Sequence, residues 1–200
     1  NPEVLTELYN FLDSEPNLAD SALQLMNITV KHSIQSRDFL LQNNIIAKLR
    51  TMPQTFSLGE FLESLCSLSP PPPAEIVQQI AEFLSHLIDG SETQILELAL
   101  SALLSLLSNG AEGIYADQFQ EPLIPILISD IPSLAPHVLS ILLLTQNPSP
   151  EFAKLFLQIL SNQEEYGIAN NPAVLIRISQ LFANFRDQWA PFCGDEVFTI

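Results

Sequence analysis

The chain has 200 residues, of which 23 are acidic and 7 are basic, so its formal net charge at pH 7 is −16. Hydrophobic residues make up 47% of it, with 6 glycines and 2 cysteines, which excludes disordered, collagen-like and disulfide-framework proteins. No Lys or Arg lies between Arg50 and Lys154. That acidic stretch would repel the phosphates of nucleic acid and of anionic lipid, so we expect neither as a partner.

The first residues, NPEVLTELYN, lack the basic and apolar regions of a secretory signal. We therefore expect an intracellular protein, with its two cysteines reduced. The longest apolar stretches, such as Val138–Leu144, are shorter than the roughly 20 residues that a bilayer span needs, so we expect no membrane span. The abrupt ends suggest a fragment of a longer chain.

Apolar residues recur at spacings of three and four along the chain, which predicts an all-helical protein. Consecutive prolines lack N–H donors and cannot lie inside a helix, so we expect Pro70–Pro73 to form an exposed turn. Turn-forming clusters separate the predicted helices, and they lie at 13–17 (DSEPN), 70–73 (PPPP), 89–92 (DGSE), 109–110 (NG), 147–150 (NPSP) and 170–172 (NNP).

A unit of about 40 residues recurs in this pattern of helices. The aligned segments are ALQLMN (22–27), GEFLES (59–64), SALLSL (101–106), VLSILL (138–143) and LIRISQ (175–180), at steps of 37, 42, 37 and 37 residues. This length is typical of armadillo or HEAT repeats, whose helices must stack on their neighbours to bury their apolar faces. An irregular helical bundle is the alternative. We expect one solenoid over 1–200, with repeats at 1–31, 32–68, 69–110, 111–147 and 148–185 and the start of another at 186–200.

Two segments are more specific than this periodicity. Residues 36–49 (SRDFLLQNNIIAKL) and 65–84 (LCSLSPPPPAEIVQQIAEFL) resemble the importin-α family in composition, order and separation, and the resemblance covers roughly 17–110. It implies an all-α, right-handed armadillo-repeat superhelix of about four and a half repeats. In that family the third helices of successive repeats line a concave groove that binds nuclear-localisation signals.

Each groove helix of importin-α carries a Trp and, four residues later, an Asn, so that both lie on one face. The resemblance places the partner-binding groove of this chain at the corresponding positions. The Trp positions hold Leu23, Glu60, Ala102, Leu139 and Ile176, and the Asn positions hold Asn27, Ser64, Leu106, Leu143 and Gln180. Asn27 alone keeps the residue of the family.

Two functions follow from this pattern. The leading one is a non-catalytic adaptor that recognises basic cargo for nuclear import, with Glu60 and Asp20 supplying charge where the family has aromatic rings; a merely solvated Glu60 is the alternative. The other is a diverged scaffold that has lost signal binding and holds another protein through an apolar groove of Leu23, Ala102, Leu106 and Leu139. The resemblance also implies a monomer in cytoplasm and nucleus, which could bind importin-β through an absent terminal segment.

Nothing in the sequence argues for catalysis, a metal or a cofactor. The three histidines, His32, His86 and His137, are widely spaced, and neither Cys66 nor Cys193 has a His nearby in the sequence. Phosphate-binding loops and nucleophile motifs are absent.

Several side chains are expected to pack rather than to bind a partner. The single Trp, Trp189, lies after the last full repeat and is interpreted as a packing residue. We expect Leu65, Leu103, Leu107 and Ile141 to face the core.

Overall fold

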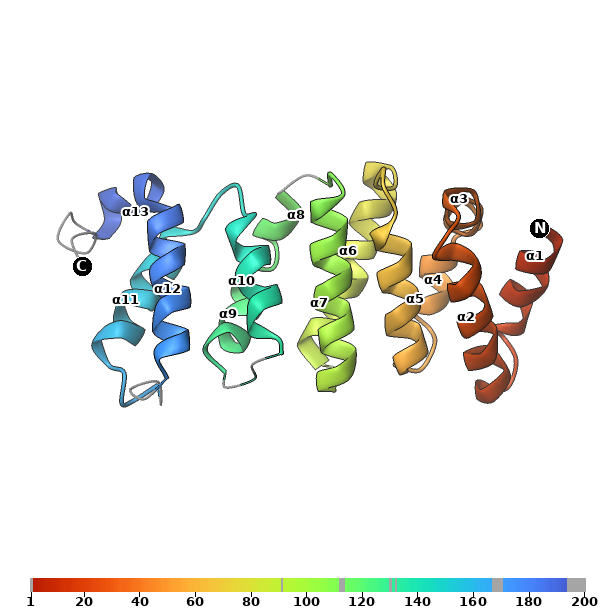
Figure 1. The fold of residues 1–200 in the computed structure, drawn as a ribbon, viewed down its shortest axis with the longest axis horizontal. Helices are drawn as coiled ribbons and strands as arrows, with labels where there is room; N and C mark the ends of the chain where they lie inside the picture. Colours follow the sequence, from red (N-terminus) through yellow and green to blue (C-terminus); the bar gives the residue numbers. More distant parts are fainter. Residues whose placement is uncertain are drawn as a thin grey trace. The chain divides into compact units, whose positions relative to one another are not determined.

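The computed structural model describes residues 2–90, 92–111, 114–129, 131, 133–166 and 171–193. Every regular element in these ranges is a helix, which confirms the prediction of an all-α protein (Figure 1). The chain divides into two compact units, Asn1–Glu112 and Gly113–Ile200. None of the described helices is long and apolar enough to cross a membrane.

The first unit contains the helices that carry most of the candidate site. They are α1 (Pro2–Phe11), α2 (Pro16–Val30), α3 (Ile34–Gln42), α4 (Ile45–Leu49), α5 (Phe56–Ser67), α6 (Ala74–Gly90) and α7 (Thr93–Ser108). Helices α2, α5 and α7 lie side by side in one layer, and α4 and α6 lie behind them (Figure 1). Leu65, Leu103 and Leu107 are buried in this unit, as predicted.

Hydroxyl side chains begin two helices of the first unit. Ser33 accepts a hydrogen bond from the backbone N–H of Ser36 at the start of α3 (3.2 Å), and Thr55 accepts one from Leu58 at the start of α5 (3.3 Å). These bonds satisfy N–H groups that have no partner within the helix, and they fix where each helix starts.

The proline-rich segment is a turn between α5 and α6, as predicted, but it is not fully exposed. Pro70 and Pro73 face solvent, whereas Pro72 is buried. A buried cation, Arg37, contacts the start of this turn. The guanidinium of Arg37 donates from Nη1 to the carbonyl oxygens of Leu68 (2.7 Å) and Pro70 (2.6 Å), which holds the turn against the unit.

The second unit contains α8 (Ile114–Asp117), α9 (Gln120–Ile128), α10 (Ala135–Leu143), α11 (Pro150–Ser161), α12 (Pro172–Asn184) and α13 (Arg186–Cys193). Ile141 of α10 is fully buried, as predicted. The carboxylate of Asp117 accepts hydrogen bonds from the backbone N–H groups of Gln146 (2.8 Å) and Asn147 (3.2 Å). This contact ties the loop after α10 to the end of α8.

Trp189 is a packing residue of the second unit, as the sequence indicated. Its side chain is buried, and its ring centroid lies 5.1 Å from that of Phe182, 5.2 Å from that of Phe185 and 6.1 Å from that of Phe156. The indole N–H donates to the carbonyl of Pro148 (3.4 Å). Such a satisfied, ring-packed indole cannot stack on a ligand.

The predicted repeat boundaries all fall between helices. Residues 32–68 hold α3, α4 and α5, two short helices followed by a longer one, and residues 69–110 hold α6 and α7. Whether these units form a continuous solenoid stays a prediction.

Candidate functional site

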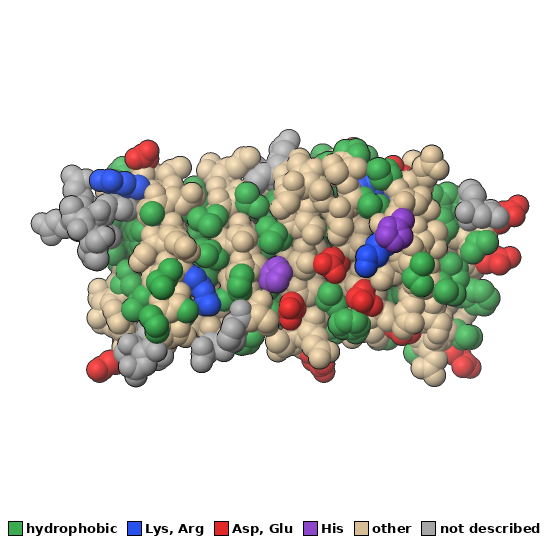
Figure 2. All heavy atoms as spheres, in the orientation of Figure 1, with side chains coloured by type: hydrophobic (Ala, Val, Ile, Leu, Met, Phe, Trp, Pro, Cys, Tyr) green, Lys and Arg blue, Asp and Glu red, His purple; other side chains and the backbone are tan. Residues whose placement is uncertain are grey.

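The layer of α2, α5 and α7 positions most of the predicted groove residues. Helix α5 packs between the other two, so polar side chains on their exposed sides share one surface (Figure 1). We call this surface the α2–α5–α7 face and define it by Gln24, Asn27, Glu60, Glu63 and Glu97. Figure 2 shows acidic side chains on this face over α5 and α7.

Asp20 and Gln24 join α2 to the start of α5. Gln24 Nε2 donates to the carboxylate of Asp20 (3.0 Å) and to Ser57 Oγ (3.2 Å), and Thr55 Oγ1 donates to Asp20 (3.1 Å). Asp20 therefore supports the helix junction. Its carboxylate is half-buried and already accepts two hydrogen bonds, so it supplies less free charge to a partner than the sequence suggested.

Glu63 has a similar position between α5 and α7. Ser101 Oγ donates to Glu63 Oε1 (2.6 Å), and both side chains are half-buried. This bond leaves the second carboxylate oxygen available at the surface. Glu60, one turn earlier on α5, is also half-buried, and in the described part of the chain its carboxylate has no hydrogen-bond partner.

Asn27 is the most informative polar residue of this face. Its Oδ1 atom is buried and has no hydrogen-bond partner among the described residues. An orphaned buried acceptor costs roughly 1 to 3 kcal/mol. Because the Asn27 side chain as a whole is partly exposed, a rotation of its amide would bring Oδ1 to the surface, where a donor from a partner would satisfy it. A backbone N–H of a bound chain is such a donor.

Other predicted groove positions are not exposed, which corrects the expectation of an apolar groove in the first unit. Leu23, Ala102 and Leu106 are fully buried, and Ser64 is 7% exposed. The sequence alignment assigned the wrong side of α2 and of α7 to the exposed face. A shift of one residue rotates a side chain by about 100° around the helix, and the connections before these helices differ in length.

The signal that sequence reasoning missed is the spacing of polar side chains. On α2, Asp20, Gln24 and Asn27 follow one another at steps of four and three, which places them on one side of the helix. On α7, Ser101 and Leu104 are half-exposed in place of Ala102 and Leu106. A search for polar residues at helical spacing would have found the observed face.

The remaining predicted positions belong to the second unit. Leu139 and Leu143 on α10 are half-buried, and Ile176 and Gln180 on α12 are exposed, with Ile176 at 59%. Each pair is four residues apart and lies along one side of its helix.

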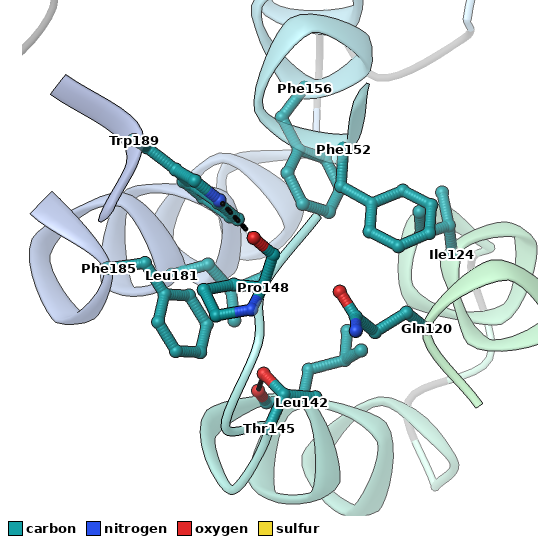
Figure 3. A pocket seen from close by; sticks show the side chains of 10 residues that line it. All are labelled: Gln120, Ile124, Leu142, Thr145, Pro148, Phe152, Phe156, Leu181, Phe185 and Trp189. Atoms are coloured by element: carbon teal, nitrogen blue, oxygen red, sulfur yellow. Dashed lines mark hydrogen bonds between the residues drawn. The ribbon is translucent and has the colours of Figure 1, made fainter. Parts of the chain in front are cut away.

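A small cavity of about 10 Å³ lies in the second unit beside Trp189. Figure 3 shows Gln120, Thr145, Pro148 and Phe152 around it, together with Phe185 between α12 and α13 and Trp189 of α13. This volume is that of about one water molecule, and the lining is largely apolar. The cavity is a packing feature and is too small for an organic ligand.

Chemistry-bearing residues elsewhere are scattered. Within the described ranges, no group of three or more His, Cys, Asp and Glu side chains is placed to hold a metal ion. Burial raises the pKa of Cys66 from 9.0 to about 12, although the nearby charge of Arg37 opposes the rise. Such a thiol stays protonated at neutral pH.

Comparison with known proteins bears on the fold alone. No family model matches the sequence, and no curated protein matches it. Among solved structures, the chain is similar to an engineered protein, a crystal structure of the Northeast Structural Genomics Consortium, with a TM-score of 0.59 and 12% identity. The match covers 98% of this chain and 89% of that one. At this identity it supports the all-helical fold and nothing about activity.

Proposed function

We propose that this chain is a non-catalytic adaptor of the armadillo-repeat type, resembling importin-α, which binds an extended basic peptide on the α2–α5–α7 face and carries such cargo between cytoplasm and nucleus. The observation that carries the proposal is the row of partly exposed carboxylates, Glu60 and Glu63 on α5 and Glu97 on α7, together with the orphaned Oδ1 of Asn27 on the neighbouring helix α2. The acceptor suits a peptide N–H, and the carboxylates suit Lys and Arg side chains.

The armadillo part of the proposal is supported by the order of the helices in the first unit. Two short helices, α3 and α4, precede the longer α5, and each of α2, α5 and α7 ends one predicted repeat. Helix α5 packs against α2 on one side and against α7 on the other, which is the nearest-neighbour packing that repeats use.

The charge of the face supports a basic partner. Helices α5, α6 and α7 contain no Lys or Arg, and Glu60, Glu63 and Glu97 are all partly exposed. Aromatic rings are absent from the aligned positions, so we expect weaker binding than in a groove with Trp–Asn pairs, at micromolar dissociation constants or above.

The scaffold alternative is less well supported for this face. Three of its four apolar residues, Leu23, Ala102 and Leu106, are fully buried and cannot contact a partner. Leu139 of the second unit is half-buried and is the only one of the four that retains partial exposure.

Fluorescence anisotropy with a labelled peptide that contains a run of lysines tests the proposal. We expect micromolar or weaker binding that weakens strongly as salt rises, because the attraction between partly exposed charges is screened. Glu60→Lys should abolish binding, and Asn27→Ala should weaken it severalfold. Glu121→Lys is the matched control, since Glu121 is exposed on α9 in the other unit. Equal loss in both Lys variants, or none in Glu60→Lys, would refute the assignment of this face.

A further inference from the structure

A second surface of the first unit has an apolar centre without a described partner. Val4 and Phe11 on α1 are 50% and 49% exposed, and Leu18 and Leu25 on α2 are both 53% exposed. Each pair is seven residues apart, so its two members lie on one side of their helix. Helices α1 and α2 pack on each other and are joined by a short turn. We call these four residues the α1–α2 face.

The α1–α2 face lies apart from the proposed peptide-binding face. Asp20 and Gln24 define the side of α2 that contacts α5, through Thr55 and Ser57. Leu18 is two residues before Asp20, which places it about 160° away around the helix axis.

The side of α5 that faces α2 is covered by that helix. Ser57, Phe61 and Ser64 follow one another at steps of four and three on α5, and Ser57 contacts Gln24 of α2. These three residues are 6%, 0% and 7% exposed. Along the row α2, α5, α7, each of α5 and α7 therefore packs against the helix that precedes it in the row. Helix α2 stands at the end of the row, and it exposes Leu18 and Leu25 on the side that points away from α5. A further helix packed on this side of α2 would continue the row, in the way that α5 packs on α2 and α7 packs on α5.

The rim of the face is acidic. Residues 1–17 contain four acids (Glu3, Glu7, Asp13 and Glu15) and no Lys or Arg, and Asp13 is paired with Lys48 (2.8 Å). Glu7 and Glu15 are exposed. Figure 2 shows apolar side chains gathered over α1 and α2 at this end, with acidic side chains at their edge. A second copy of the chain, at a net charge of −16, would bring like charges together here.

We propose that the α1–α2 face binds an amphipathic α-helix of another protein, whose apolar stripe covers Val4, Phe11, Leu18 and Leu25 and whose flanks are basic. An apolar centre with a complementary charged rim is the arrangement by which helices are recognised in grooves of other proteins. This site adds to the proposed peptide-binding function and does not depend on it.

The test uses a synthetic peptide of Leu and Lys, with Leu at positions i, i+3, i+4 and i+7, and calorimetry with the full chain. We expect binding with a gain of peptide helicity in circular dichroism. All variants are made in the Glu60→Lys background, which removes binding at the α2–α5–α7 face. In that background the double variant Leu18→Gln, Leu25→Gln should bind at least about tenfold more weakly, while Ile176→Gln, a similarly exposed change on α12, should bind as before. These half-exposed positions tolerate Gln, so the fold is retained.

Four results would overturn the proposal. One is equal binding of a peptide with the same composition in an order that cannot form an apolar stripe. Another is equal weakening by Ile176→Gln. The third is a dimer of the chain alone, in analytical ultracentrifugation, that Leu18→Gln, Leu25→Gln dissociates, since a second copy would then occupy the face. The fourth is loss of all binding in Glu60→Lys alone, which would show that the peptide had used the α2–α5–α7 face instead.

Discussion

Arg37 is a charged side chain that is only 2% exposed, and its hydrogen bonds compensate for the burial of its charge. Nη1 donates to two carbonyls of the proline-rich turn, and Nη2 lies 2.8 Å from the carboxylate of Asp38. A planar guanidinium can make these contacts at once, whereas an ammonium cannot reproduce the geometry.

Replacing Arg37 should therefore destabilise the first unit. We expect Arg37→Lys to lower the free energy of unfolding by about 2 kcal/mol and Arg37→Met by about 3 kcal/mol, because two carbonyls of the turn lose their buried donor while the Asp38 carboxylate, which is 43% exposed, can be hydrated instead. Urea denaturation measures both. Arg50→Lys is the control, since Arg50 is 40% exposed in its pair with Glu82 and should change stability by less than about 1 kcal/mol. A similar effect at both sites would contradict this account of the turn.

Cys66 gives the protein a predictable response to alkaline pH. Burial raises its pKa from 9.0 to about 12 in the folded chain, so the unfolded chain releases this proton first as pH rises. Stability from this group is complete below pH 9 and falls by about 1.4 kcal/mol per pH unit between pH 9 and 12. In thermal unfolding, Cys66→Ala should lose stability less steeply with pH over that range, because one fewer proton is released on unfolding. Cys193→Ala should show a smaller change of the same sign, since burial also raises the pKa of Cys193. An unchanged slope in Cys66→Ala would contradict the assignment.

At the scale of elements, Gly59 sets how closely α5 approaches α7. A Cβ atom at this position would lie 2.8 Å from Cδ1 and 3.0 Å from Cβ of Leu98. We expect Gly59→Ala to destabilise the chain by about 1 to 2 kcal/mol, because overpacking exceeds the gain of up to about 1 kcal/mol in helix propensity.

Two further variants make this prediction specific. Leu98→Ala in the same chain should recover part of the loss, and a double-mutant cycle in urea measures that coupling. Gly90→Ala, where no atom lies within 4 Å of the added Cβ, should be neutral or slightly stabilising. If Gly59→Ala behaves like Gly90→Ala, the two helices are not in close contact at this point.

The elements themselves were largely predictable from the sequence. Apolar spacing of three and four indicates helices wherever it is sustained, and Pro, Ser and Asn in the connections mark their ends, so the predicted boundaries at 31, 68, 110, 147 and 185 fall between helices. The rotation of each helix was not predictable in the same way. Leu23 and Ala102 were assigned to an open groove and are buried, because a single residue of misalignment turns a side chain by about 100°, from the exposed side of a helix into the core.

The contacts that decide the site also lie beyond sequence reasoning. Gln24 meets Ser57 across 33 positions, and Glu63 meets Ser101 across 38. Local spacing says nothing about such pairs. The unpartnered Oδ1 of Asn27 likewise depends on which neighbours bury it.

At the scale of the whole molecule, charge is the property that most restricts the partner. A net charge of −16 with only 7 basic residues favours fast encounter with cationic chains and makes any such complex sensitive to salt. The two units, Asn1–Glu112 and Gly113–Ile200, share this acidic character, and the proposed peptide-binding residues belong to the first of them.

The most direct test of the proposed function is to map where a basic peptide binds. A lysine-run peptide with a central photo-crosslinking residue, irradiated with the full chain at low salt and analysed by mass spectrometry, reports the contacted helices. We predict crosslinks on α2, α5 and α7 near Asn27, Glu60 and Glu63, which disappear in Glu60→Lys. Crosslinks confined to the second unit, or a pattern unchanged by Glu60→Lys, would contradict the proposal that the α2–α5–α7 face recognises basic peptides.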